Sequence, residues 1–132
     1  MNKLLFDSFA LLRFFQKEPG GEKVRELLKE SLADGVPRLL NAINLGEMIY
    51  IVQRRCGEQK KLEMLAHLHR MDFTLLPCPN DLIFRAAELK ARHPISYADA
   101  FALASAIEHS ASLVTGDPEF RRVEGLVEII WI

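Results

Sequence analysis

The stretch SYADAFALASAIEHSASLVTGDP, residues 96–118, contains the most apolar helix of the chain and a short apolar strand directly after it. Ser96 begins the predicted helix, which runs through Ile107, and SLVT at 112–115 is typical of a buried strand. Asp99 lies in the first turn of this helix, and Asp117 lies just past the strand. A helix that leads into a buried strand indicates an α/β protein with parallel pairing.

The same alternation of short apolar runs and helical stripes continues along the rest of the chain. Strands are predicted at LLF (4–6), RLLNAI (38–43), FTLLP (73–77) and LVEII (126–130). Helices are predicted near 10–15, 24–32, 45–56, 58–71 and 82–89, the fourth with Leu62 on its inner face. Because strands that alternate with helices pair in parallel through right-handed crossovers, we expect an α/β sandwich.

Length and composition favour one globular domain spanning residues 1–132. With 132 residues, 49% of them apolar and 27% charged, the chain is close to the commonest domain size and composition. No apolar run approaches the roughly 18 residues of a membrane span, so no membrane association is expected. Asp7 and Arg13 interrupt the signal-like N-terminus, and the two cysteines lack metal-site spacing, so we expect a reduced, cytoplasmic protein. The net charge of −1 gives no electrostatic indication of nucleic-acid binding.

Four acids follow apolar runs or lie at helix starts. Asp7 directly follows LLF, Asp117 follows SLVT, and Glu47 lies in the first turn of the helix after RLLNAI. In open parallel sheets, sites form beyond the carboxyl ends of the strands, so these three acids are expected at one edge of the sheet. Asp99 reaches that edge only if its helix runs antiparallel to the strands, which the pattern alone leaves open.

Each acid also has an ordinary structural interpretation. The segments Asn44–Glu47 and Ser96–Asp99 both fit a capping box, in which the fourth residue returns to the backbone of the first. Asp7 is able to cap the short helix that follows it. Asp117, in a Gly-Asp-Pro turn, fits turn chemistry. Caps and turns are common enough that any one acid, taken singly, is explained this way at least as well.

Taken together, the acids predict a divalent-metal site. Asp99 is flanked by apolar residues and has no Lys or Arg three or four positions away, although a buried carboxylate needs a partner. Oxygen ligands without His or Cys suit Mg²⁺ or Mn²⁺. The hydroxyls of Ser8 and Thr115 are supporting candidates that hydrogen-bond a carboxylate or fill a turn, and Asn44 is a supporting residue or only a cap.

Four blocks of the sequence, in order, resemble the PIN domain family and, within it, VapC-type toxin ribonucleases of toxin–antitoxin pairs. The blocks are LLFDSFALL, NAINLGEMIY, SYADAFALASA and LVTGDPEF, and they carry Asp7, Glu47, Asp99 and Asp117 respectively. The resemblance implies a three-layer α/β/α sandwich with a five-stranded parallel sheet and a Mg²⁺-dependent endoribonuclease. It also implies a homodimer, an RNA substrate, a VapB-like antitoxin partner, and an Asp99 helix that begins at the acidic edge. Phe9 departs from the small residue usual beside the first acid, which bears on access to the site.

Three other functions compete with this interpretation. The same fold with acids kept for stability would be a non-catalytic interaction module, and a DNA-cutting nuclease of related fold is a further alternative. A receiver-type phosphoacceptor domain pairs two acids near its first strand, whereas Asp7 stands alone. The chain also lacks a G-x-S-x-G elbow, a G-x-G-x-x-G motif and a Walker loop, which argues against a serine hydrolase or a nucleotide cofactor.

Overall fold

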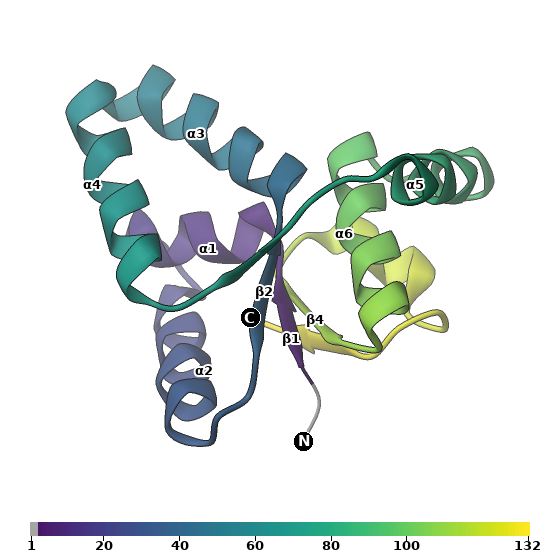
Figure 1. Ribbon diagram of the computed structural model, residues 1–132, viewed down its shortest axis with the longest axis horizontal. Coiled ribbons are helices and arrows are strands. Elements are labelled where there is room, and N and C mark those ends of the chain that lie inside the picture. The colour runs from purple at the N-terminus through teal and green to yellow at the C-terminus, as the bar shows by residue number, and fades with distance from the viewer. Residues whose placement is uncertain (1–2) are drawn as a thin grey trace.

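A computed structural model describes residues 3–132 and contains one five-stranded parallel sheet with helices on both faces (Figure 1). Met1 and Asn2, which open the signal-like stretch, lie outside the described residues. The strand order is β3-β2-β1-β4-β5, and every neighbouring pair is parallel. The predicted three-layer α/β/α sandwich is therefore confirmed.

The elements alternate along the chain as the apolar pattern predicts. The strands are β1 (Leu4–Phe6), β2 (Arg38–Asn41), β3 (Thr74–Leu76), β4 (Ser112–Thr115) and β5 (Ile129–Trp131). The helices are α1 (Ser8–Phe15), α2 (Gly21–Ala33), α3 (Ala42–Cys56), α4 (Glu58–Arg70), α5 (Asn80–Arg92) and α6 (Tyr97–His109), with a 3-10 helix η1 (Pro118–Val123).

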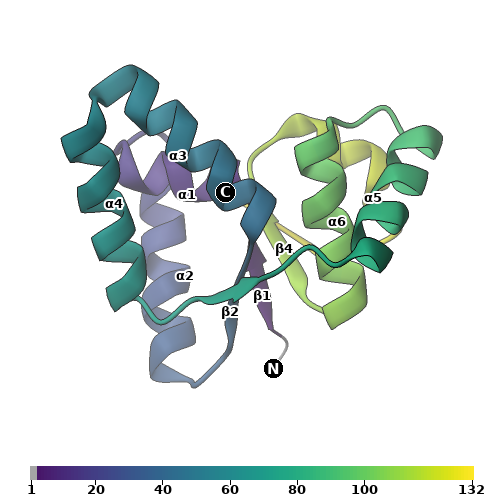
Figure 2. The same cartoon turned by 45° about the horizontal axis from the view of Figure 1, so that its top comes forward.

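Two apolar cores lie on opposite faces of the sheet, because successive strand residues point to opposite sides. Phe6 faces α1 to α4 and belongs to one core with Leu11 and Met48. Leu5 faces α5 and α6 and belongs to the other core with Leu103. Figures 1 and 2 show these two helical layers on either side of the strands. Helix α6 is buried nearly all round, as its apolar sequence predicts.

The second predicted strand is too long, because Asn41 starts a helix. The side-chain oxygen of Asn41 accepts a hydrogen bond from Ile43 N at 2.8 Å and so caps α3. The strand therefore ends at Asn41 rather than at residue 43. The predicted Asn44–Glu47 capping box is wrong, since both residues lie inside the helix.

Four further differences concern short or exposed segments. The predicted last strand, 126–130, is observed at Ile129–Trp131, and the first helix begins at Ser8 rather than near residue 10. The 3-10 helix η1 was not predicted, because six residues carry too little periodicity for helix recognition. Leu62 is 48% exposed rather than inward, because Met64 and Leu68 form the buried face of α4. Across residues 3–132, no helix is long and apolar enough to cross a membrane.

The register of β1 and β4 brings their carboxyl ends together. Phe6 pairs with Val114, so the residues that follow them, Asp7 and Thr115, are neighbours at one edge of the sheet. Asn41, at the end of β2, leads into α3 on the other side of β1. This edge, at which β1, β2 and β4 end, is called the acidic edge below, because Asp7, Glu47, Asp99, Asp117 and Glu119 gather there.

Candidate metal centre

Asp7 is buried at the end of β1, and both of its carboxylate oxygens accept hydrogen bonds. Its Oδ1 accepts a hydrogen bond from Ala10 N at 2.8 Å, so Asp7 is the N-cap of α1. Its Oδ2 accepts a hydrogen bond from the Thr115 hydroxyl on the neighbouring strand. Burial raises the pKa of Asp7 to about 7, although these two hydrogen bonds favour the charged form. Each oxygen keeps a further lone pair, so capping does not exclude binding of a cation.

Thr115 connects Asp7 to Asp117. The Thr115 Oγ1 donates to Asp7 and accepts a hydrogen bond from Asp117 N at 3.0 Å. Asp117 in turn caps η1 through its Oδ1, which accepts from Glu119 N at 2.9 Å. The predicted turn chemistry of Asp117 is therefore present, and it places the carboxylate beside the end of β4.

Glu47 and Ser8 join α3 to α1 at the same edge. Glu47 lies one and a half turns into α3 and is half-buried, and its Oε1 accepts a hydrogen bond from the Ser8 hydroxyl. Repulsion from the Glu47 and Asp117 carboxylates adds to the raised pKa of Asp7. Glu47 is therefore close enough to Asp7 for the two charges to interact.

Asp99 lies in the first turn of α6 and carries a buried oxygen with no partner. Ser96 caps this helix by accepting a hydrogen bond from Asp99 N at 3.1 Å, as predicted. Asp99 is only 6% exposed, and its Oδ2 makes no hydrogen bond with any described residue. Burial, a hydrogen bond with Glu119 and repulsion from Asp117 raise the pKa of Asp99 to about 9. An orphaned carboxylate oxygen in such a place needs a proton or a cation.

Glu119 is the acid at this edge that the sequence pattern missed. Its Oε1 accepts a hydrogen bond from Ser96 N at 3.0 Å, so it ties η1 to the start of α6. A hydrogen bond with Asp99 lowers the pKa of Glu119 below its usual value. The available signal was its position two residues after Asp117, where the first turn of a helix would place both acids together.

Asn44 is a buried link between α3 and α6. Its Nδ2 donates to Ala98 O at 3.0 Å, one residue before Asp99. Its Oδ1 is buried and, among residues 3–132, has no hydrogen-bond partner. Asn44 therefore fixes the start of α6 against α3 instead of capping a helix.

The five acids form two adjacent groups. One oxygen from each of Asp99, Asp117 and Glu119 lies within 4.8 Å of the others, whereas Asp7 and Glu47 stand outside this tight group. None of these five carboxylates forms an ion pair with Lys or Arg within the described part of the chain. A set of oxygen ligands with unbalanced charge and one orphaned oxygen fits a hard divalent cation.

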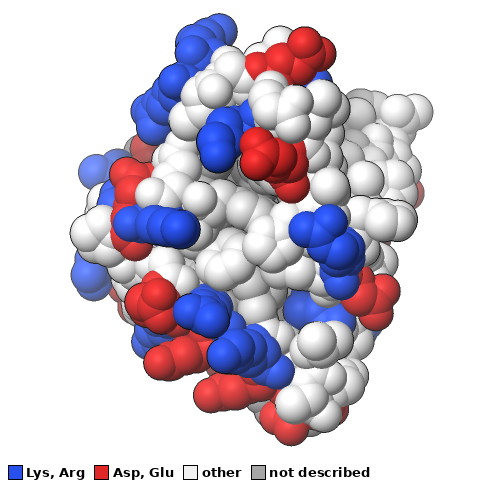
Figure 3. Space-filling model, turned by 90° about the vertical axis from the view of Figure 1, so that its left-hand side faces the viewer, with Lys and Arg blue, Asp and Glu red and all other residues white. Residues whose placement is uncertain are grey.

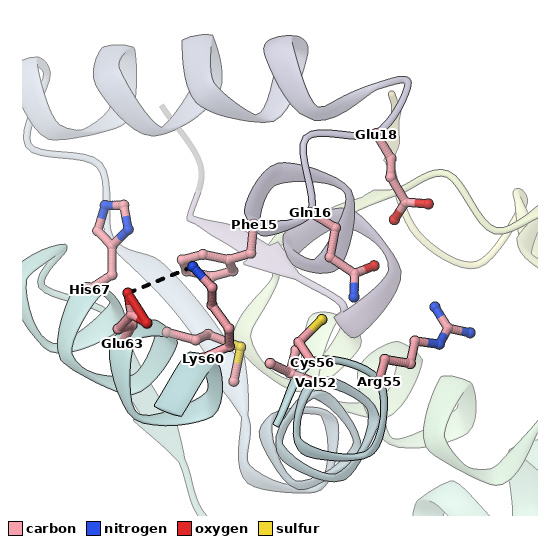
Figure 4. A pocket seen from close by; sticks show the side chains of 10 residues that line it. Phe15, Gln16, Glu18, Val52, Arg55, Cys56, Lys60, Glu63 and His67 are labelled. Carbon is pink, nitrogen blue, oxygen red and sulfur yellow. Dashed lines mark ion pairs between the residues drawn. The ribbon is translucent and has the colours of Figure 1, made fainter. Parts of the chain in front are cut away.

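Two cavities lie elsewhere, on the α1–α4 side of the sheet. One, of about 630 Å³, is bordered by the end of α1 and by α3 and α4, and another of about 670 Å³ continues toward α2. Figure 3 shows that this face carries both signs of charge around an uncharged, hollowed middle. In Figure 4, Lys60 points toward Glu63 on the same helix, α4, which lines the first cavity, and their charged atoms lie 3.8 Å apart. We refer to this first cavity as the α1–α4 groove.

Comparison with known proteins identifies the fold. The family model described as "PIN domain" matches residues 4–126. DNA-bound VapBC from Salmonella typhimurium superposes with a TM-score of 0.80 at 18% sequence identity, over 98% of both chains. VapBC2 from Rickettsia felis, bound to a promoter DNA fragment, gives 0.78 at 20% identity over 96% of both chains.

A third similar structure is VapC20 from Mycobacterium tuberculosis, a sarcin–ricin loop cleaving toxin. It gives a TM-score of 0.76 at 20% identity, over 96% of this chain and 98% of that one. No curated protein matches the sequence significantly. At these identities the solved structures establish the shared fold, and the family model establishes the wider relationship.

Proposed function

Since this chain belongs to the PIN domain family, we propose that it is a metal-dependent endoribonuclease, the toxin of a type II toxin–antitoxin pair. Members of this family are nucleases. The reaction proposed is hydrolysis of RNA phosphodiester bonds at the acidic edge, with Mg²⁺ as cofactor and Mn²⁺ able to replace it. The observation that carries the proposal is the buried Asp99 Oδ2, which has no hydrogen-bond partner among residues 3–132 and lies among carboxylates that form no ion pair there.

In this mechanism Asp7 and Asp99 are the main ligands, and Glu47 and Asp117 bind directly or through water. When bound, the cation supplies Lewis acidity toward a phosphate oxygen and acidifies a water molecule that attacks phosphorus. The chain's own residues position these groups. Thr115 holds Asp7 through its hydroxyl, and the same oxygen fixes the backbone of Asp117.

Ser8 and Asn44 position the other two elements of the site. The Ser8 hydroxyl orients Glu47 by donating to one of its oxygens, which leaves the second oxygen free to bind. Asn44 holds the backbone of α6 one residue before Asp99. Both residues therefore act through the ligands they orient.

The positive charge of Arg13 near this edge favours a substrate with a phosphate backbone. The guanidinium of Arg13 lies 4.7 Å from the centre of the Phe9 ring. That ring packs against Gly116, between Thr115 and Asp117, so closely that a Cβ on Gly116 would meet it at 2.6 Å. Arg13 is thus held beside the acidic edge, where it can contact a phosphate. Phe9 borders the same edge and, in this proposal, restricts the size of the substrate.

The proposal includes a VapB-like antitoxin partner, a homodimer, and a cytoplasmic location for a single nuclease domain spanning residues 1–132. The complexes named VapBC among the similar structures support the antitoxin partner. Large exposed apolar side chains support self-association, with Phe84 on α5 62% exposed and Leu75 on β3 50% exposed. Light scattering of the purified protein measures the mass of the assembly, and a monomer at micromolar concentration would count against the dimer.

The alternatives are a non-catalytic interaction module and a DNA nuclease of related fold. The orphaned oxygen of Asp99 argues against the first, because an acid retained for stability should be hydrogen-bonded. The second differs only in substrate and is separated by direct comparison of nucleic acids.

Incubation of the purified protein with single-stranded RNA and single-stranded DNA, with Mg²⁺ or with a chelator, tests the proposal. We expect RNA to be cut internally with Mg²⁺, and not in chelator. Cleavage of DNA alone would support the DNA nuclease, whereas cleavage of neither substrate in the absence of an antitoxin would support the interaction module.

A further inference from the structure

Glu119 takes over a hydrogen bond that Asp99 would otherwise make. In a capping box, the acid at the third helical position accepts a hydrogen bond from the N–H of the N-cap residue. In α6 the N-cap is Ser96 and the acid at that position is Asp99, but the N–H of Ser96 donates to Glu119 Oε1 at 3.0 Å. Asp99 is therefore released from capping, and its Oδ2 is left buried without a partner.

The positions of three carboxylates leave room for an ion. Oxygens of Asp99, Asp117 and Glu119 lie within 4.8 Å of one another. Oxygen ligands about 2.0–2.1 Å from Mg²⁺ lie up to roughly 4.2 Å apart across the ion, so small side-chain rotations would complete the contacts. The hydrogen bond from Ser96 N is accepted by Glu119 Oε1, and a carboxylate has a second oxygen, Oε2, that can bind a cation.

We propose that Glu119 is a further metal ligand of this protein, which completes a divalent-cation position with Asp99 and Asp117 while it holds Ser96 in place of Asp99. The inference rests on the proposed metal-dependent function and adds a residue that the four sequence blocks do not include. The same carboxylate serves both purposes, since its Oε1 accepts from the helix start and one of its oxygens lies within 4.8 Å of oxygens of Asp99 and Asp117.

The test compares Glu119→Gln with wild type by Mn²⁺ titration calorimetry and thermal melting. Glutamine keeps a side-chain oxygen that can accept from Ser96 N but lacks the negative charge. The matched control is Glu124→Gln, at the exposed end of η1, which removes the same charge away from the cluster. We expect Glu119→Gln to weaken Mn²⁺ binding at least about tenfold or to remove one bound ion, and the control to bind as wild type does.

Melting in chelator separates a ligand from a purely structural acid. If Glu119 is a ligand, Glu119→Gln melts in chelator at the wild-type temperature or above, because the variant relieves repulsion among carboxylates. A variant that is unfolded or clearly less stable in chelator would assign Glu119 a structural role and overturn the inference. Unchanged Mn²⁺ affinity and stoichiometry would overturn it as well.

These outcomes differ from a failure of the proposed function. If wild-type protein binds Mn²⁺ and cuts RNA while Glu119→Gln binds Mn²⁺ equally well, only the role of Glu119 is wrong. If wild-type protein binds no Mn²⁺ at millimolar concentration, both the proposed metal centre and the proposed role of Glu119 are wrong. A third outcome is RNA cleavage that persists in chelator, together with Mn²⁺ binding that depends on Glu119. In that case Glu119 is a metal ligand, and only the proposed catalytic use of the ion is wrong.

Discussion

The acidic edge and the α1–α4 groove are two candidate ligand-binding regions of this protein, and they differ in charge balance. The groove is a cavity of about 630 Å³, and Arg55, Lys60, Glu63 and His67 around it include both signs of charge. At the acidic edge five carboxylates meet without an ion pair in the described part of the chain.

The difference shows that carboxylates without ion pairs and with raised pKa values, rather than the volume of a cavity, identify the reactive region. In the groove Lys60 and Glu63 already neutralise each other on a solvated face. At the acidic edge, burial raises the pKa of Asp7 to about 7 and that of Asp99 to about 9. Strongly perturbed acids grouped in one place are typical of functional sites.

The substitution Asp99→Asn should have the largest effect and tests whether the acidic edge is the reactive region. We expect RNA cleavage to fall at least about 100-fold, because the variant removes the carboxylate whose buried Oδ2 has no partner among residues 3–132, while Ser96 still caps α6. Initial rates on single-stranded RNA measure the effect. The matched control is Asp81→Asn in the first turn of α5, an exposed acid that should retain the wild-type rate. Normal cleavage by Asp99→Asn would make Asp99 a structural residue.

Addition of metal should stabilise the acidic edge and leave the groove unaffected. At millimolar Mn²⁺ we expect the melting temperature of the wild type to rise by at least about 4 °C, since an ion that binds only the native state stabilises it by mass action. Asp99→Asn should show a much smaller rise. Scanning fluorimetry with and without chelator makes the measurement, and equal rises in both proteins would place the ion elsewhere.

The pH dependence of stability gives a third test. The native pKa of Asp7, about 7, and that of Asp99, about 9, lie above the ordinary 3.8, so below pH 4 the native and unfolded chains hold the same protons. As pH rises from about 4 to 9, the metal-free native state retains protons that the unfolded state releases, and its free energy of unfolding falls. Each group contributes at most roughly 1.4 kcal/mol per pH unit.

Metal-free wild type should therefore melt at a lower temperature at pH 8 than at pH 5.5, and Mn²⁺ should raise the melting temperature more at pH 8. Asp99→Asn should flatten this dependence. Melting curves across this range in chelator make the measurement, and a metal-free protein that gains stability toward pH 8 would contradict the raised pKa values.

The smallest effect is expected in the groove. Replacement of Arg55 or Lys60 by alanine should leave the cleavage rate within about twofold, because exposed side chains away from a site contribute within roughly 0.5 kcal/mol. The Mn²⁺-dependent rise in melting temperature should also be unchanged. A tenfold loss of cleavage in either variant would show that the groove takes part in the reaction and would end the contrast between the two regions.

Much of this architecture was predictable because the apolar pattern is strong where the chain is buried. The strands that contain Leu5, Leu39 and Leu113 were recognised from short buried runs, and α6 from its uniformly apolar sequence. The errors lie where a local hydrogen bond decides the outcome. Asn41 ends a strand by capping α3, and Asp117 starts a 3-10 helix, and neither event leaves a periodic signal.

The sequence by itself determined that acids follow the buried strands, and hence that Asp7 and Asp117 would lie at one edge of a parallel sheet. Only the tertiary structure decided that α6 begins at this same edge and that Glu119 accepts the hydrogen bond from Ser96 in place of Asp99. The physical reason is that short-range apolar patterning sets where each strand and helix lies along the chain. The partner of a buried carboxylate depends instead on segments far apart in the chain that meet only when both cores have formed.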